Sequence, residues 1–148
     1  MKHFILTAII FLFALFASNA VAGDKEDVQT LINTTAETFN KHNFKKYFSN
    51  FVDDNTEFPY VVSPLRHDAV RWKAFIEGTR SLAYLNYHWK DFQVQIYNGN
   101  SAVVTSYYNF AWMEKVGQMN YQSGKATMDA VKQGGKWLIA HMHFSKMF

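Results

Sequence analysis

The sequence contains no cysteine, so disulfides cannot stabilise this chain. A domain of this length without disulfides has to be held together by its hydrophobic core. Aromatic residues make up 18% of the chain, which is enough to build such a core. The sequence also lacks a glycine-rich phosphate loop, a G-x-S-x-G motif and an H-E-x-x-H motif. Nucleophilic hydrolysis by cysteine or serine is therefore disfavoured.

The sequence has little net charge and no run of five like charges. The formal net charge is +3, and it falls to about +2 if Lys2 is removed by processing. A charge this small does not favour a polyanionic partner. We therefore expect no nucleic acid partner.

The first 22 residues have the layout of a cleaved secretory signal. A basic start is followed by the apolar run Phe4–Ala17, and the small residues Ala20–Ala22 precede Gly23. The apolar run is shorter than the roughly 20 residues that a membrane-spanning helix needs. We therefore expect a signal peptide over 1–22, a single domain over 23–148 in the periplasm or outside the cell, and no membrane contact after cleavage. An uncleaved membrane anchor is the alternative.

Helical spacing of apolar residues dominates the first half of the remaining chain. It predicts a helix over 24–42, a short helical piece over 44–51 and a third helix starting at His67 or Asp68. In the third helix we expect Val70, Ala74 and Phe75 to face inward. Between the second and third helices, residues 53–55 have turn chemistry and residues 57–62 resemble a short strand.

The second half changes to a period of two, which predicts strands. Four long strands are expected over 84–97, 101–113, 121–133 and 137–145. Asn98-Gly99 and Gly134-Gly135 are hairpin signals between them. Helices followed by an antiparallel meander predict an α+β protein, a conical fold in which N-terminal helices pack on a strongly curved antiparallel sheet. Such a cone encloses a pocket.

This order of elements over Asp24–Phe148 resembles the SnoaL-like family of the nuclear transport factor 2-like superfamily. The ending over Lys125–Ser145, which includes G-G-K-W-L-I-A-H-x-H-F-S, is similar to those of SnoaL-like and kinase II association-type domains. The resemblance implies the conical fold. It does not imply one activity, because the superfamily includes isomerases, dehydratases, cyclases, binding modules and oligomerisation domains. Compared with ketosteroid isomerase, the analogues of the oxyanion donors would be Tyr107 or Tyr108 with Asp129, and the general base has no clear counterpart.

Two histidines near the C-terminus are candidates for chemistry. His141 and His143 lie two apart in a predicted strand, so they should share a face. The hairpin register brings Asp129 close to Ala140 or His141. The pair could be polar groups of a pocket or interface, an acid/base group, or metal ligands. One carboxylate and one imidazole form a dyad and not a metal cage, so we expect no metal and no cofactor. If the site is catalytic, His141 is the base or donor, Asp129 orients it and Tyr107 assists.

Aromatic residues with polar tips are candidates for binding a flat, largely apolar ligand. The predicted ligand-binding residues are His143, Trp89, Trp112, Tyr121, Tyr60 and Trp72. The sequence Arg66-His67, with Arg71 in the following helix, could meet a ligand carboxylate or form a solvated helix face.

The sequence favours an exported domain that binds a small, largely apolar or aromatic molecule. It is expected to form a homodimer through an exposed sheet face. Two alternatives remain open: a cofactor-free lyase or isomerase using the His–Asp pair and a tyrosine, and an oligomerisation or interaction module.

Overall fold

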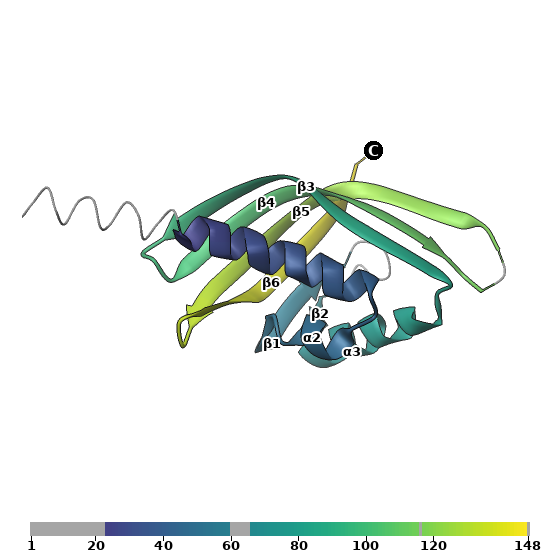
Figure 1. The fold of residues 1–148 in the computed structure, drawn as a ribbon, viewed down its shortest axis with the longest axis horizontal. Coiled ribbons are helices and arrows are strands. Elements are labelled where there is room, and N and C mark those ends of the chain that lie inside the picture. Colours follow the sequence, from purple (N-terminus) through teal and green to yellow (C-terminus); the bar gives the residue numbers. More distant parts are fainter. Residues whose placement is uncertain (1–22, 60–65, 116, 148) are drawn as a thin grey trace, which may run out of the picture.

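The computed structural model describes residues 23–59, 66–115 and 117–147 and has a long helix lying across a curved sheet (Figure 1). The strands are β1 Phe51–Phe58, β2 His67–Asp68, β3 Tyr84–Tyr97, β4 Ser101–Met113, β5 Met119–Gln133 and β6 Lys136–Lys146. They form one sheet in the order β2-β1-β6-β5-β4-β3. Neighbouring strands are antiparallel except β1 and β6, which are parallel. The predicted α+β fold, with helices packed on a strongly curved sheet, is confirmed. The predicted signal peptide lies outside the described residues.

The N-terminal helix spans residues 23–40, close to the predicted range, and buries one side against the sheet. Val28 and Ile32, four residues apart on one face, are both fully buried. Asp24 lies in the first turn, where the helix dipole favours a carboxylate. It forms an ion pair with Lys132 at 2.5 Å and accepts a hydrogen bond from Trp137 Nε1 at 3.1 Å. These contacts attach the start of the helix to the β5–β6 hairpin.

The next segment differs from the prediction because β1 starts early. Helix α2 covers only Phe44–Phe48, and the chain enters β1 at Phe51. Residues 53–55, predicted to form a turn, lie inside this strand. The cause is pairing with β6, since Ile139 N donates to Asn50 O at 2.8 Å; tertiary pairing overrides local turn preference. The strand predicted over 57–62 therefore begins earlier, and its residues 60–62 lie outside the described residues.

Helix α3, Ala69–Gly78, packs through a different face from the one predicted. Trp72 and Ile76 are buried, whereas Val70 is 78% exposed and Ala74 is also exposed. The prediction that Val70 and Ala74 face inward was wrong. Burying an indole ring removes much more apolar surface from water than burying a valine or an alanine, so the helix turns its Trp72 side to the core.

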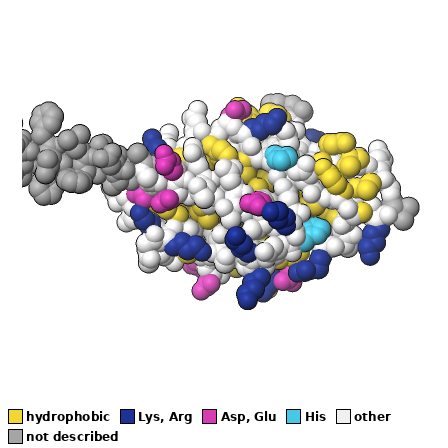
Figure 2. Space-filling model, in the orientation of Figure 1, with side chains coloured by type: hydrophobic (Ala, Val, Ile, Leu, Met, Phe, Trp, Pro, Cys, Tyr) yellow, Lys and Arg dark blue, Asp and Glu magenta, His cyan; other side chains and the backbone are white. Residues whose placement is uncertain are grey.

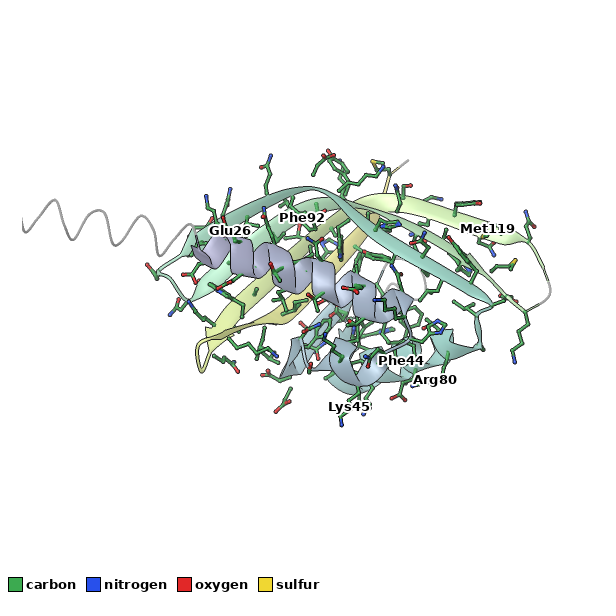
Figure 3. The ribbon with its side chains drawn as sticks, viewed as in Figure 1. Glu26, Phe44, Lys45, Arg80, Phe92 and Met119 are labelled. Carbon is green, nitrogen blue, oxygen red and sulfur yellow. The ribbon has the colours of Figure 1, made fainter. Side chains whose placement is uncertain are left out.

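A short 3-10 helix, η1 Thr79–Ser81, follows α3 and contacts α2. The guanidinium of Arg80 lies over the ring of Phe44, 4.6 Å from its centroid, and both residues are labelled in Figure 3. This cation–π contact helps to hold the helical layer together at the end of the molecule away from the β5–β6 turn.

Two tight hairpins join the long strands as predicted. Asn98 and Gly99 have φ values of 51° and 67°, and Gly134 and Gly135 have values of 57° and 80°. Two successive residues with positive φ are typical of the turn whose twist matches that of the flanking strands. Glycine adopts this conformation without steric cost. Both turns therefore fix the strand register on either side.

Strand β3 contains a β-bulge that keeps its aromatic residues on one face. The register with β4 shifts between Lys90 and Gln93, and Asp91 has a φ of 55°. The hydroxyl of buried Ser106 donates to Lys90 O at 2.7 Å and holds the bulge in place. Because of the extra residue, Trp89 before the bulge and Phe92 after it both pack toward the core.

Strand β6 contains a second bulge with the opposite consequence for its histidines. Asp129 pairs with His141, but its neighbour Ala130 pairs with Ile139, which leaves Ala140 as the extra residue. Before the bulge the inward residues have odd numbers, as Ile139 does. After it they have even numbers, as buried Met142 does. After the bulge, each side chain of β6 therefore lies on the opposite face of the sheet from the one it would occupy in a regular strand.

Candidate ligand-binding cavity

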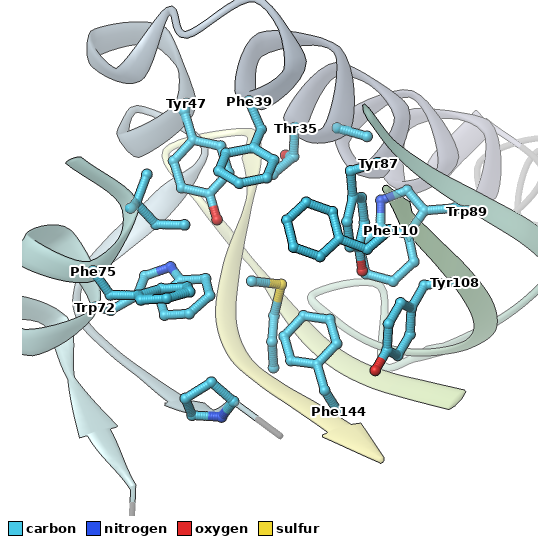
Figure 4. A pocket seen from close by; sticks show the side chains of 14 residues that line it. Thr35, Phe39, Tyr47, Trp72, Phe75, Tyr87, Trp89, Tyr108, Phe110 and Phe144 are labelled. Carbon is cyan, nitrogen blue, oxygen red and sulfur yellow. The ribbon is translucent and has the colours of Figure 1, made fainter. Parts of the chain in front are cut away.

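A cavity of about 70 Å³ lies between the helical layer and the concave side of the sheet and is partly open to solvent (Figure 4). Its walls come from the N-terminal helix, α2, α3, β3, β4, β6 and the residue after β1. Most of the lining side chains are aromatic. The lining residues are Thr35, Ala36, Phe39, Tyr47, Pro59, Trp72, Phe75, Ile76, Tyr87, Trp89, Tyr108, Phe110, Met142 and Phe144.

The sheet side of the cavity is a wall of interlocked rings. Tyr87 stacks on Tyr108 with centroids 5.8 Å apart and meets Trp89 edge-on at 4.7 Å. Trp89 in turn stacks on Phe144 at 6.0 Å. Ring pairs at these separations are mutually attractive. The rings come from three different strands, so the wall is braced across the sheet.

Two hydrogen-bond donors of this wall have no partner among the described residues. The hydroxyl of Tyr87 and the indole N–H of Trp89 are both buried and unpaired. Buried polar groups are nearly always paired, and an unpaired one calls for an explanation. The hydroxyl of Tyr108 differs, because it accepts a hydrogen bond from Gln122 Nε2 at 2.9 Å. In Figure 4 the Tyr87 hydroxyl points into the space between the helical side and the sheet side.

A buried carboxyl group, that of Glu57, lies next to the lining residue Met142, its neighbour on β6. Glu57 is 0% exposed. Asn55 Nδ2 donates to its Oε1 at 3.4 Å, while its Oε2 has no partner among the described residues. Burial raises the pKa of Glu57 well above 4.5, and the hydrogen bond from Asn55 offsets only part of this. The carboxyl group therefore holds its proton to a higher pH than an exposed glutamate does.

Glu57 also affects the tyrosines of the cavity. Burial raises the pKa of Tyr47 well above 10.0, with a further increase from Glu57 and an opposing hydrogen-bond effect of the Trp72 indole. Burial likewise raises the pKa of Tyr87, followed by the effects of Tyr108, Tyr47 and Glu57. Both tyrosines therefore stay neutral at physiological pH.

Three of the six predicted ligand-binding residues lie at the cavity or beside it. Trp72 and Trp89 line it. Trp112 stacks on the lining residue Phe110 with centroids 4.7 Å apart, and so supports the wall from behind. Tyr60, also predicted, lies outside the described residues.

The other predicted site residues lie away from the cavity. Tyr121 is 76% exposed and Tyr107 is 42% exposed on the outer face of the sheet. After the bulge in β6, His141 and His143 also face outward, opposite to Met142. Asp129 pairs with His141 as predicted, but on this outer side.

The predicted His–Asp pair consequently has no cavity in front of it. His141 Nδ1 is hydrogen-bonded to Thr56 Oγ1 at 2.7 Å. The ring of Phe58 meets His141 and His143 edge-on, with centroids 5.6 and 5.9 Å away. The geometry gives a catalytic role for Asp129, His141 and Tyr107 no support. Among the described residues no group of three or more His, Asp or Glu side chains could hold a metal ion.

The basic residues Arg66, His67 and Arg71, which could have met a ligand carboxylate or formed a solvated helix face, are not among the lining residues. Arg66 and Arg71 are exposed, and His67 is half-buried against Phe75 with ring centroids 6.5 Å apart. In the view of Figure 2, Lys and Arg side chains lie mainly along the lower edge with Asp and Glu among them. Among the described residues, no helix has the length and apolar character that crossing a membrane requires.

The curved sheet, the helix across it and the cavity between them define a nuclear transport factor 2-like protein, as predicted. Within this superfamily the chain belongs to the calcium/calmodulin dependent protein kinase II association domain family, which matches residues 24–148. The predicted superfamily is thus confirmed, and the family that matches is the association domain. No curated protein sequence matches the chain.

Solved structures share the fold at low sequence identity. A protein from Novosphingobium aromaticivorans, provisionally named scytalone dehydratase, superimposes with a TM-score of 0.81 at 12% identity, covering 88% of this chain and 89% of that one. A nuclear transport factor 2-like superfamily protein from Salmonella enterica serovar Typhimurium gives 0.77 at 15% identity, covering 86% and 94%. The association domain of calcium/calmodulin dependent protein kinase II from C. elegans gives 0.69 at 15% identity, covering 84% and 97%. Identities this low support the fold alone.

Proposed function

We propose that this protein is exported, self-associates, and binds a small, largely apolar or aromatic molecule in its cavity. The observation that carries the binding proposal is the aromatic lining of a cavity of about 70 Å³. That volume is several times the minimum of about 10–15 Å³ that one water molecule needs. Apolar cavities of this kind favour apolar guests, because water inside them finds few partners.

The expected affinity follows from the buried area. A single aromatic ring buries about 150 Å² of apolar surface, which contributes about 4 kcal/mol. This free energy corresponds to a Kd of about 1 mM before hydrogen bonds are added and the cost of association is subtracted. Single-ring compounds should therefore bind weakly, and larger molecules that reach through the mouth should bind more tightly.

Filling the cavity tests the binding proposal. Ala36 lines the cavity from the N-terminal helix, so Ala36→Trp should occupy it and abolish saturable binding of single-ring compounds, measured by calorimetry. Ala74→Trp is the matched control, since Ala74 is exposed on α3. Circular dichroism would check that both variants fold. Unchanged binding in Ala36→Trp, or no binding by the wild type, contradicts the proposal.

The proposal of self-association rests on the family and on the outer face of the sheet. Membership of an association domain family points to assembly of like chains. The outer face of the sheet carries the exposed aromatic residues Phe58, Tyr107 and Tyr121, and such residues are enriched where proteins meet. A second copy of this chain is therefore the proposed occupant of this face.

Sedimentation velocity tests this interface. Tyr121→Lys places a charge on the outer face and should shift the protein toward the monomer. Val70→Lys is the control, because Val70 is equally exposed on α3, in the helical layer. A dimer that survives Tyr121→Lys but dissociates with Val70→Lys would assign the interface to the helical side.

Export is proposed from the sequence of residues 1–22. The complete chain, expressed in a Gram-negative host, should be recovered from the periplasm with Gly23 as its first residue. Mass spectrometry of the purified protein measures this directly. A protein that retains Met1 in the membrane fraction would favour the uncleaved anchor.

A further inference from the structure

The described part of the cavity lining combines buried hydrogen-bond donors that have no partner with an absence of basic side chains. Among the described lining residues there is no Lys, Arg or His. A fully buried carboxyl group, that of Glu57, pairs with the lining residue Met142 on the neighbouring strand. A ligand carboxylate would thus lose its hydration without gaining a counter-charge.

The hydroxyl of Tyr87 and the indole N–H of Trp89 lie on the same face of β3, two residues apart. Each is buried and has no partner among the described residues. A buried donor left unpaired is costly, and a ligand that supplies an acceptor removes this cost. The remainder of the wall is rings and aliphatic side chains, which suit the hydrocarbon part of the same ligand. The shape of the site and its unpaired donors therefore call for a molecule that is apolar at one end and accepts a hydrogen bond at the other.

We propose that the cavity selects neutral aromatic compounds with a hydrogen-bond-accepting oxygen, such as an aryl ketone or aldehyde, and that Tyr87 donates to this oxygen with Trp89 as a second donor. The inference rests on the proposed function, because it names the class of molecule that the same cavity binds. It adds two exclusions. Pure hydrocarbons of the same shape bind less tightly because they leave the donors unpaired, and aryl carboxylates bind less tightly because the cavity offers them no positive charge.

Three compounds of nearly equal size test the selection: acetophenone, ethylbenzene and benzoate, titrated into the full-length mature protein at pH 7 by calorimetry. One net hydrogen bond is worth about 1 kcal/mol, which is about fivefold in Kd. Acetophenone should therefore bind about fivefold more tightly than ethylbenzene, and benzoate should bind at least tenfold more weakly than acetophenone.

Two matched variants locate the donor. Tyr87→Phe keeps the ring and removes the hydroxyl, so the preference for acetophenone over ethylbenzene should largely disappear while ethylbenzene binding stays the same. Tyr97→Phe is the control, because Tyr97 is exposed at the end of β3 and does not line the cavity. Its preference should match that of the wild type.

The outcomes distinguish a failure of the proposed binding function from a failure of the proposed selectivity. If none of the three compounds binds, the proposed function itself is overturned. If ethylbenzene binds as tightly as acetophenone, or benzoate binds as tightly as either, the cavity binds small molecules but the selection is wrong. If Tyr87→Phe keeps the preference for acetophenone, the assignment of the donor is overturned.

Discussion

Replacing Glu57 by glutamine should change how the stability of the protein depends on pH. The carboxyl group is fully buried, and burial raises its pKa in the folded protein well above the 4.5 of an unfolded chain. The folded protein therefore holds this proton more tightly than the unfolded chain does. The stabilisation is fully present below pH 4.5 and is lost as pH rises toward the folded pKa.

The size of the pH effect on stability is set by the one proton that the folded chain binds and the unfolded chain releases. While the folded chain holds the proton and the unfolded chain has released it, the free energy of unfolding falls by about 1.4 kcal/mol per pH unit. Glu57→Gln removes this contribution and keeps the shape of the side chain. Its oxygen can still accept from Asn55, and its amide replaces the Oε2 atom, which has no partner.

Urea unfolding of both proteins between pH 5 and pH 8 measures the difference. His67 pairs opposite Glu57 on β2, but it is present in both proteins, so the difference between them isolates Glu57. We expect Glu57→Gln to become the more stable of the two as pH rises. Glu77→Gln, on the exposed side of α3, is the control and should follow the wild type. A wild type and a Glu57→Gln variant with parallel pH profiles would refute a raised pKa of the buried Glu57.

Two further predictions concern positions outside the cavity. Gly124→Ala should lower the free energy of unfolding by about 1–3 kcal/mol in urea titrations. A Cβ at this position would meet the backbone carbonyl oxygen of Ser145, which cannot rotate away as a side chain could. Unchanged stability would show that β5 and β6 can separate at this point. In Asp24→Asn the free energy of unfolding should fall less steeply with decreasing pH than it does in the wild type. The hydrogen bond from Lys132 lowers the pKa of Asp24 below 3.8. The stabilisation from Asp24 is therefore present above that pH and is lost as pH falls through the folded pKa. Asp27→Asn is the control, because Asp27 is exposed on the same helix. If the free energy of unfolding falls equally with decreasing pH in both variants, the role of Asp24 is contradicted.

The hairpins and the register between the last two strands could be predicted from local sequence. Asn98-Gly99 and Gly134-Gly135 specify tight turns with positive φ, and a tight turn fixes which residues pair on either side. That is why the pairing of Asp129 with His141 could be predicted by counting from the turn. The conical fold followed from the order of the elements and from the length of the strands.

The face on which the histidines lie could not be predicted in the same way. In a regular strand His141 would share a face with buried Ile139, and so would point into the cone. The single extra residue at Ala140 reverses this for everything that follows. No residue with special turn chemistry marks the bulge, because it arises from how β6 fits between β5 and β1. The same reversal brings Met142 and Phe144 to the cavity.

Glu57 was missed for a related reason. A glutamate in a short strand is usually exposed, and the sequence around it has turn-forming residues. Its burial depends on tertiary packing against α2 and β6, which lie far apart in sequence. The alternation of Asn55, Glu57 and Pro59 on one face was the available signal, but it could be used only once the strand was known to start at Phe51.

Nuclear Overhauser contacts between a bound ring and the protein locate the guest molecule most directly. With acetophenone added to protein labelled at its methionine methyl groups, we expect contacts to the methyl of Met142, which lines the cavity, and none to exposed Met147. Contacts to Met147 without Met142, or no saturable contact at all, would contradict the view that this fold encloses a binding cavity.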